Sequence, residues 1–478
     1  MVRRILPYIR QYETHRQLAG RARPGNWRVG RADLDAIIVP ASRTADNLQH
    51  AVSLAQAAQC WLVVLCSRDS RATDVYQLFT GKRFRKGVAV DISADYHHPW
   101  LAFISSDLAR NDESPACVNP NGDLSTKRNL GLLLARMLGW SRIFFMDDDV
   151  RDVSLADLRA TVSMLDRYRS VGMRVTNYAD NSVVCHAHRA TGANQDVFVS
   201  GSVLAVNCQQ PFGFFPEIYN EDWLFFYDDV RAGRLGWSER DVTQLPYDPF
   251  ENVERAERQE FGDILAEGLY ALLHLDSDLS TAPDRYWNKF LATRKRFLEE
   301  IIWRAEFVAP EIGQNIVRAV QTAMLRLMQL QPQAFEDYIN AWQDDLRVWA
   351  ERLETVPRVG SVAEALERLA LDSAQRGHAT VHEPVGTVPA LHVILDGAAF
   401  VVYIMASNLR YGRAAPMFTR IRQWIQRTDP RGAIGSKPEA PNAEPELALA
   451  QDPALAAAPG QGPRQLPDVV GSTWDGRA

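Results

Sequence analysis

The segment that begins at Arg142 constrains the fold most, because four consecutive apolar residues run directly into Asp147, Asp148 and Asp149. A short continuous apolar run is typical of a strand buried on both faces, as in the middle of a parallel sheet. Aspartate is depleted inside strands, so this strand is predicted to end at Asp147. Open α/β sheets bind ligands at the carboxyl ends of their strands. We therefore expect the three aspartates at a ligand-binding edge.

Three adjacent carboxylates repel one another unless a positive charge lies among them. Hard divalent cations prefer carboxylate oxygen, so the motif indicates Mg²⁺ or Mn²⁺ carrying phosphate oxygens. The alternative is a solvated acidic turn before the next helix, since acids favour helix N-termini and the segment from Ser154 to Asp157 has the pattern of a capping box. The buried strand before the acids, and a second acidic pair at Glu221 and Asp222, favour the metal.

Length and composition limit the class of protein. A chain of 478 residues is long enough for two or three domains, and 46% hydrophobic with 23% charged residues is usual for a globular protein. The formal net charge of -6 argues against nucleic acid as the main partner. The five cysteines are scattered without a CxxC pair, which fits a reducing compartment and argues against a zinc ribbon or a disulfide framework.

Neither a secretory signal nor a membrane span is predicted. Polar residues interrupt the start of the chain soon after Pro7, and Pro389 and Asp396 interrupt the longest apolar stretch, residues 388–407. A membrane span needs about 20 mostly apolar residues. We interpret residues 388–407 as a buried helix or strand–helix segment, and we predict a cytoplasmic protein.

Hydrophobic periodicity predicts alternating strands and helices in the first half of the chain. Strands are expected at 35–43 (broken by Pro40), 61–65, 88–92, 101–106 and, around a small-residue turn, within 195–206. Helices are expected at 47–58, 125–138, 155–168, 259–274 and 335–353. The first strand, helix and strand form a βαβ unit with a right-handed crossover.

The chain is predicted to have four parts. They are an Arg-rich N-terminal arm (1–33), an α/β domain (34–280), a helical C-terminal region (281–428) and a Pro- and Ala-rich disordered tail (429–478). For the arm three interpretations stay open: a segment packed on the core, a patch that faces phosphate, or partial disorder. The helical region is expected to cover the acceptor side of the molecule or to form a homodimer contact.

Charged residues near the triple aspartate suggest further parts of a site. The helix that opens at residue 125 precedes the central strand directly, which should bring Lys127 and Arg128 close to the aspartates; the alternative is that both are solvated surface charges. Glu221 and Asp222 lie among many aromatic residues. Asp222 is explained either as a helix N-cap or as a half-buried carboxylate with a raised pKa, able to act as a base.

In chain order, the sequence has a βαβ unit, the triple aspartate, a small-residue turn and the Glu221–Asp222 pair. This order resembles a glycosyltransferase of the GT-A type, closest in pattern to the family 2 enzymes, over about residues 35–274. The resemblance implies a Rossmann-like, mixed and mostly parallel sheet flanked by helices, and transfer of a sugar from a nucleotide-diphosphate donor. It places donor-binding residues at the ends of the first two strands, the DxD motif, the start of the next helix and the small-residue turn: Pro40, Ala41, Ser42, Arg43, Ser67, Asp69, Lys127, Arg128, Asp147, Asp148, Gly201 and Ser202. The absence of a QxxRW-type motif argues against synthesis and export of a polymer.

The resemblance also implies the chemistry. Asp149 holds the metal, with Asp147 towards the ribose, and His274 is a candidate third ligand; His186 and His188 are no better supported. The cation neutralises the leaving diphosphate. In the Glu221–Asp222 pair, Asp222 takes the proton of the attacking hydroxyl, which inverts the anomeric carbon. A UDP-sugar, with UDP-glucose as the default, is the expected donor, and a small soluble molecule or a peripheral lipid-linked one is the expected acceptor.

Other functions stay open from the sequence. They are a retaining glycosyltransferase, a nucleotidyltransferase, a catalytically silent nucleotide-sugar-binding protein and a phosphatase of the haloacid dehalogenase type, in which the first aspartate is the nucleophile. The phosphatase is disfavoured because more than a hundred residues precede the acidic motif here.

Overall fold

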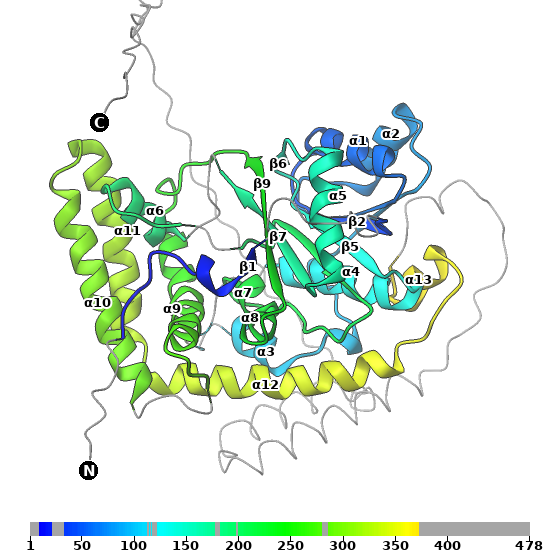
Figure 1. Cartoon of the computed structure of the whole chain (residues 1–478). Helices are drawn as coiled ribbons and strands as arrows, with labels where there is room; N and C mark the ends of the chain where they lie inside the picture. The colour runs from blue at the N-terminus through cyan, green and yellow to red at the C-terminus, as the bar shows by residue number, and fades with distance from the viewer. Residues whose placement is uncertain are drawn as a thin grey trace, which may run out of the picture. The chain divides into compact units, whose positions relative to one another are not determined.

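The computed structural model describes residues 9–21, 33–111, 114, 116, 122–176, 182–196, 199–279 and 285–371. All of them lie in one compact unit, Met1–Thr387 (Figure 1). The predictions for 388–407, for the tail and for most of the N-terminal arm fall outside the described residues. Within this part of the chain, no helix combines the length and the apolar character needed to cross a membrane.

A mixed, mostly parallel sheet forms the centre of this unit, which confirms the predicted fold class. Its order is β4-β3-β2-β5-β8-β7-β9-β1, with β6 paired to β9. β8 runs antiparallel to both of its neighbours, and β6 is antiparallel to β9. The strands are β1 (Gly20–Arg21), β2 (Ala36–Ala41), β3 (Trp61–Cys66), β4 (Gly87–Asp91), β5 (Arg142–Met146), β6 (Val150–Arg151), β7 (Ser170–Val175), β8 (Val203–Asn207) and β9 (Leu235–Gln244).

Strand β5 is buried on both faces, as its sequence predicts. Ile143 and Phe145 belong to the core on one side of the sheet, and Phe144 and Met146 belong to the core on the other side. The strand ends at Met146, so the aspartates begin where the strand stops.

Helices cover both faces of the sheet (Figure 1). One core packs against α1 (Gln49–Ala58), α2 (Ala72–Gly81) and α5 (Leu155–Ser163). The opposite core packs against α4 (Leu124–Leu138) and continues into the later helices. These are α6 (Val183–Ala190), α7 (Glu221–Phe225), α8 (Tyr227–Arg231), α9 (Glu254–His274), α10 (Tyr286–Ala305), α11 (Pro310–Gln329), α12 (Pro332–Thr355) and α13 (Val362–Arg368).

Two local predictions need correction. The first strand is not broken at Pro40, because Pro40 pairs with β3 while the pairing of β2 with β5 stops at Ile38, so the missing N–H removes no ladder bond there. Residues 101–106 do not form a strand. They contain the end of a 3-10 turn (Pro99–Leu101) and the start of α3 (Ile104–Arg110).

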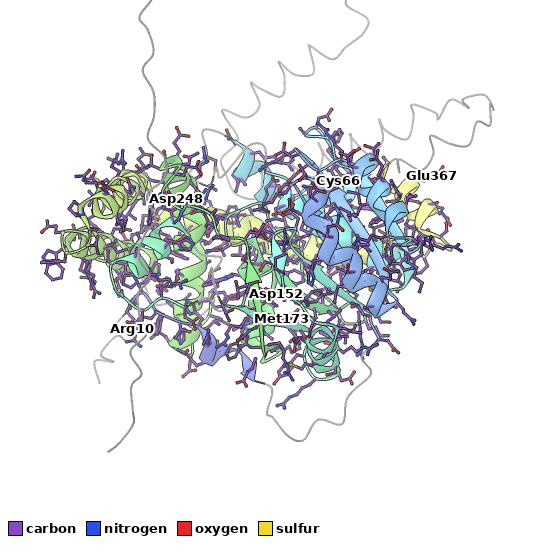
Figure 2. All side chains as sticks on the ribbon, turned by 90° about the horizontal axis from the view of Figure 1, so that it is seen from above. Arg10, Cys66, Asp152, Met173, Asp248 and Glu367 are labelled. Carbon is purple, nitrogen blue, oxygen red and sulfur yellow. The ribbon has the colours of Figure 1, made fainter. Side chains whose placement is uncertain are left out.

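Residues 9–21 pack against the rest of the unit. His15 is buried, with Nε2 3.0 Å from Glu267 of α9, and β1 adds to the sheet beside β9. The described part of the N-terminal segment therefore packs on the core, through His15 and β1. In the view of Figure 2, Arg10 lies on the opposite side of the molecule from Cys66, the last residue of β3.

Candidate active site

The predicted donor-site residues meet at one edge of the sheet. β2, β3 and β5 are parallel, so their carboxyl ends share that edge. β8 is antiparallel to β5, which brings the residues before β8 to the same place. The amide of Asp147 donates to the carbonyl of Ser202 at 2.9 Å. The triple aspartate and the small-residue turn are therefore neighbours.

Asp148 ties the end of β5 to the turn after β2. Its Oδ2 accepts from the amides of Ser42 at 2.7 Å and Arg43 at 2.8 Å, and its Oδ1 pairs with the Arg43 guanidinium. Asp148 is buried. With both oxygens engaged in this way, it positions the turn.

Asp149 is buried beside Asp148. Its Oδ2 accepts from Arg43 Nη2 at 2.9 Å, and its Oδ1 accepts from Gln244 Nε2, at the end of β9, at 3.2 Å. Burial, followed by repulsion from the carboxylate of Asp147, raises the pKa of Asp149 to about 6 although Arg43 opposes the shift. Its charged form therefore lacks full compensation.

Arg128 of α4 lies between the triple aspartate and the Glu221–Asp222 pair and contacts both. Its Nη2 donates to both oxygens of Asp147, at 3.1 and 3.2 Å, and its Nη1 pairs with Glu221. The guanidinium carbon lies 5.5 Å from the centre of the Phe215 ring, within cation–π range. The side chain is only 2% exposed. Arg128 is therefore no solvated surface charge, and the alternative interpretation is wrong for this residue.

Asp222 lies in the first turn of α7. Its Oδ2 accepts from the amide of Gly201 at 2.5 Å, and its Oδ1 accepts from the amide of Trp223 at 2.8 Å. Asn220, which has a left-handed φ of 64°, is the N-cap residue, so the N-cap explanation of Asp222 is wrong. Burial raises the pKa of Asp222, and the charge of Arg128 opposes that shift.

Gly201 lets these groups approach one another. A Cβ at this position would lie 2.7 Å from Arg128 Nη1 and 2.8 Å from the Cβ of Asp222. Real Cβ contacts are not this short, so only glycine fits without displacing its neighbours.

A cavity of about 120 Å³ opens beside these acids. Arg128, Glu221 and Asp222 form its charged wall, and Ser200, Tyr219 and Trp223 line it from the neighbouring loop and α7. A proton acceptor, a cation and aromatic rings therefore surround one space.

Lys127 has a different place from Arg128. Its Nζ donates to the carbonyl of Ala41 at 2.8 Å and to Ser67 Oγ at 2.6 Å, and it pairs with Asp123 at 3.1 Å. It thus joins the ends of β2 and β3, and it is buried rather than solvated. Asp69 is exposed at the same edge, with its amide donating to Ser42.

His274 lies beside the N-terminal segment. Its ring stacks on Tyr12 with centroids 3.9 Å apart, and its nitrogens face His15 at 2.9 Å and Gln17 at 3.4 Å. Burial, followed by the charge of His15, lowers the pKa of His274 to about 4. His186 faces the Tyr247 hydroxyl at 3.4 Å.

Two groups of side chains bear on metal binding. Among the described residues, Cys185, Asp263 and Glu267 hold ligand atoms within 4.8 Å of one another. However, Asp263 pairs with Arg294 at 2.6 Å, and Glu267 faces His15, so these acids already have cationic or hydrogen-bonding partners inside the core. The triple aspartate fits a cation on different grounds, because burial, together with repulsion from the neighbouring aspartates, raises the pKa of Asp149, and a bound cation would favour its charged form.

Three features of the site have little signal in the sequence. Gln244 contacts Asp149 from 95 residues away, and the end of β9 contains no motif that indicates this. Tyr219 and Trp223 line the cavity, but their sequence signal is only their position beside Glu221 and Asp222. The pairing of Arg43 with two of the aspartates also appears only in the folded chain.

No family model and no curated protein sequence matches the chain. Among solved structures it is similar to a mannosyltransferase from Pyrobaculum calidifontis in complex with GDP-mannose and Mn²⁺, with a TM-score of 0.35 and 12% identity over 72% of this chain and 91% of that one. It is also similar to glucosyl-3-phosphoglycerate synthase from Mycobacterium tuberculosis in complex with Mn²⁺, UDP-glucose and phosphoglyceric acid, with a TM-score of 0.33 and 13% identity over 53% and 87%. Both TM-scores are low, so neither likeness supports an inference about the activity of this chain.

Proposed function

We propose that this chain is a metal-dependent glycosyltransferase of the GT-A type, which moves a sugar from a nucleotide-diphosphate donor to a hydroxyl group of an acceptor. One observation carries the proposal. Arg128 pairs with Asp147 on one side and with Glu221 on the other. A cation-binding motif and a carboxylate beside a cavity therefore share one buried arginine at the carboxyl edge of the parallel strands.

Asp149 and Asp147 are the residues that would hold a divalent cation. When bound, such a cation neutralises the charge that develops on the diphosphate as the glycosidic bond breaks. Arg43 pairs with Asp149, and its guanidinium is well suited to binding phosphate oxygens. We assign Arg43 to the diphosphate of the donor.

Asp222 is the proposed base. It lines the cavity, and burial raises its pKa, which makes its carboxylate a better proton acceptor. The hydrogen bonds from Gly201 and Trp223 hold the carboxylate in one orientation. The acceptor hydroxyl would lose its proton to Asp222 as it attacks the anomeric carbon from the face opposite the diphosphate, which inverts that carbon.

The finer assignments belong to the same proposal. The donor is a UDP-sugar, with UDP-glucose as the first to test, and the acceptor is a small molecule that enters the cavity beside Asp222. Location in the cytoplasm and a homodimer formed through the C-terminal helices stay predictions.

The proposal is tested in two steps. First, a panel of nucleotide sugars is screened for Mn²⁺-dependent thermal stabilisation, because a ligand that binds the folded state raises the melting temperature. Second, turnover of the donor found in this way is measured for Asp222→Asn. We expect turnover to fall about 10²- to 10⁴-fold while Mn²⁺-dependent donor binding persists.

The control is Asp74→Asn, an exposed residue in the first turn of α2, which should behave as the wild type. If Asp222→Asn keeps most of its turnover while donor and metal still bind, the base is another residue. If no nucleotide sugar stabilises the wild type with Mn²⁺, the proposed function is wrong.

A further inference from the structure

The described residues that line the cavity beside Asp222 carry more negative than positive charge. Arg128 is the one cation among them, and Glu221 and Asp222 are the acids. The charge of Arg128 also acts on Asp147, with which it pairs, so three carboxylates share one guanidinium. Lys127 adds no charge to this cavity, because its ammonium group lies between the ends of β2 and β3.

This excess charge disfavours an anionic acceptor. The charged side chains are shielded from water, because Arg128 is 2% exposed and Glu221 and Asp222 are each 8% exposed. Repulsion between like charges is stronger in such a site than in water, since the effective dielectric constant is lower. A bound donor does not reverse the sign, because a divalent cation and the diphosphate that it binds nearly neutralise each other. A phosphate or carboxylate group on the acceptor would therefore need an additional cation, which no described residue of the cavity supplies.

The rest of the cavity wall is apolar and aromatic. Leu124, the first residue of α4, lines the cavity together with Val199, and it is one of the few large apolar side chains that the described part of the chain leaves exposed. Trp223 is partly exposed, and its ring contacts those of His15 and Tyr270 at centroid distances of 5.2 and 4.9 Å. These contacts fix the indole before an acceptor binds, so it offers C–H groups a rigid surface at little entropic cost.

The volume limits how much of an acceptor enters. The cavity measures about 120 Å³, whereas an enclosed cavity of ~150 Å³ holds benzene. It therefore admits one ring or a short carbon chain, and the remainder of a longer acceptor must lie outside it.

We propose that the acceptor is an uncharged alcohol, such as a neutral sugar or cyclitol ring, whose hydrocarbon face packs on Trp223 and Leu124. Phosphorylated and carboxylated alcohols are poor acceptors, because the cavity repels them. The inference rests on the proposed function, since it assigns the acceptor of that reaction, but it concerns binding and is tested without a donor.

The test follows the indole N–H of Trp223 by NMR in the full chain labelled with ¹⁵N-tryptophan. This resonance is identified as the one that is missing from Trp223→Phe. Matched pairs of probes are titrated, namely glucose with glucose 6-phosphate, myo-inositol with its 1-phosphate, and glycerol with glycerol 3-phosphate, and inorganic phosphate is the control for binding elsewhere. We expect at least one uncharged probe to shift the resonance, with a Kd about tenfold or more below that of its phosphorylated partner.

Leu124→Lys changes the charge of the cavity without removing a charged residue of the site. The variant should bind the phosphorylated probe about two- to fivefold more tightly than the wild type, as an exposed ion pair allows, and should not bind the uncharged probe more tightly. Leu124→Gln, with a polar but uncharged side chain, is the matched control and should gain no affinity for the phosphorylated probe.

Three results overturn the inference. They are a Trp223 resonance that no uncharged probe shifts, a phosphorylated probe that binds as tightly as its uncharged partner, and equal affinity of Leu124→Lys and Leu124→Gln for the phosphorylated probe. The proposed function has a separate test, which is Mn²⁺-dependent stabilisation by a nucleotide sugar. If an uncharged probe binds but no nucleotide sugar stabilises the chain, the proposed function is wrong while the preference of the cavity for uncharged alcohols stands.

Discussion

Two arginines decide how the acidic residues of the candidate active site are arranged. Arg43 pairs with Asp148 and Asp149, and Arg128 pairs with Asp147 and Glu221. With Asp222, five carboxylates share two guanidinium groups, so the site carries three negative charges when every acid is ionised. That excess is what a divalent cation bound beside Asp149 would offset.

The raised pKa of Asp149 predicts pH-dependent binding of the cation. A metal ligand must be deprotonated, so below a pKa of about 6 the proton competes with Mn²⁺ and affinity should fall by up to about tenfold per pH unit. Affinity should level off above pH 7. Isothermal titration calorimetry from pH 5 to pH 8 measures this slope.

Asp149→Asn should bind Mn²⁺ more weakly and without that slope, whereas Asp74→Asn should keep the slope. The same pKa shift also sets how the folding stability of the protein, measured without added metal, depends on pH. The pKa is raised on folding, so the stabilisation that Asp149 contributes is complete below the ordinary aspartate pKa of 3.8 and is lost as the pH rises through about 6. A Mn²⁺ affinity that does not change between pH 5 and pH 7 would contradict the role of Asp149 as a ligand.

Gly201 provides a steric prediction. In Gly201→Ala the new methyl group meets Arg128 and Asp222, so we expect a loss of about 1–3 kcal/mol in the free energy of unfolding, together with reduced turnover. Urea unfolding and the transferase assay measure the two effects. Gly81→Ala is the control, because a Cβ there meets nothing within 4 Å and the residue ends α2. Equal stability of the two variants would show that Arg128 and Asp222 move aside easily.

Among the elements, α3 depends on a residue far away in the chain. Asp345 of α12 accepts from the amide of Ile104 at 3.0 Å and from that of Ser105 at 2.7 Å, which satisfies two free amides at the start of α3. We expect Asp345→Ala to lower the free energy of unfolding by about 1–2 kcal/mol, as the loss of a helix cap does. Chemical unfolding and the exchange rates of the α3 amides measure this.

Asp345→Asn keeps one acceptor oxygen and should show a smaller loss. The neighbouring Asp344→Ala removes an ion pair with Arg347, which is itself mostly exposed, and should cost less than about 1 kcal/mol. If Asp344→Ala and Asp345→Ala are equally destabilising, Asp345 does not act as a cap.

Local signals predicted the elements whose causes are local. The continuous apolar run of β5, the helical spacing of α1 and α12, and the glycine after α4, which adopts a left-handed φ of 72°, all lie within short segments. The prediction of a strand at residues 101–106 is wrong, because the helix that begins there is completed by Asp345, about 240 residues away. The same limit applies to the site. The sequence predicts the acids at the strand ends. The contact of Gln244 with Asp149, and the position of Arg128 between Asp147 and Glu221, follow only from the tertiary fold.

At the scale of the whole described unit, residues far apart in the sequence complete one another. His15 faces Glu267 in the core, and β1 adds to β9. His15→Ala leaves a buried carboxylate without this partner, so we expect it to lower the free energy of unfolding by about 1–3 kcal/mol. The exposed His97→Ala is the control and should change stability by less than about 0.5 kcal/mol. Guanidinium unfolding of both variants, at one pH, distinguishes a packed N-terminal segment from one that contributes nothing to stability.

The Asp345 cap also has a consequence for biosynthesis. Ile104 is synthesised 241 residues before Asp345, which at about 5–20 residues per second is a delay of roughly 10–50 seconds. Until Asp345 is synthesised, α3 lacks the carboxylate that accepts from the amides of Ile104 and Ser105. Nascent chains arrested before residue 345 should therefore be cleaved by protease near Ile104, and chains arrested well beyond it should be protected there.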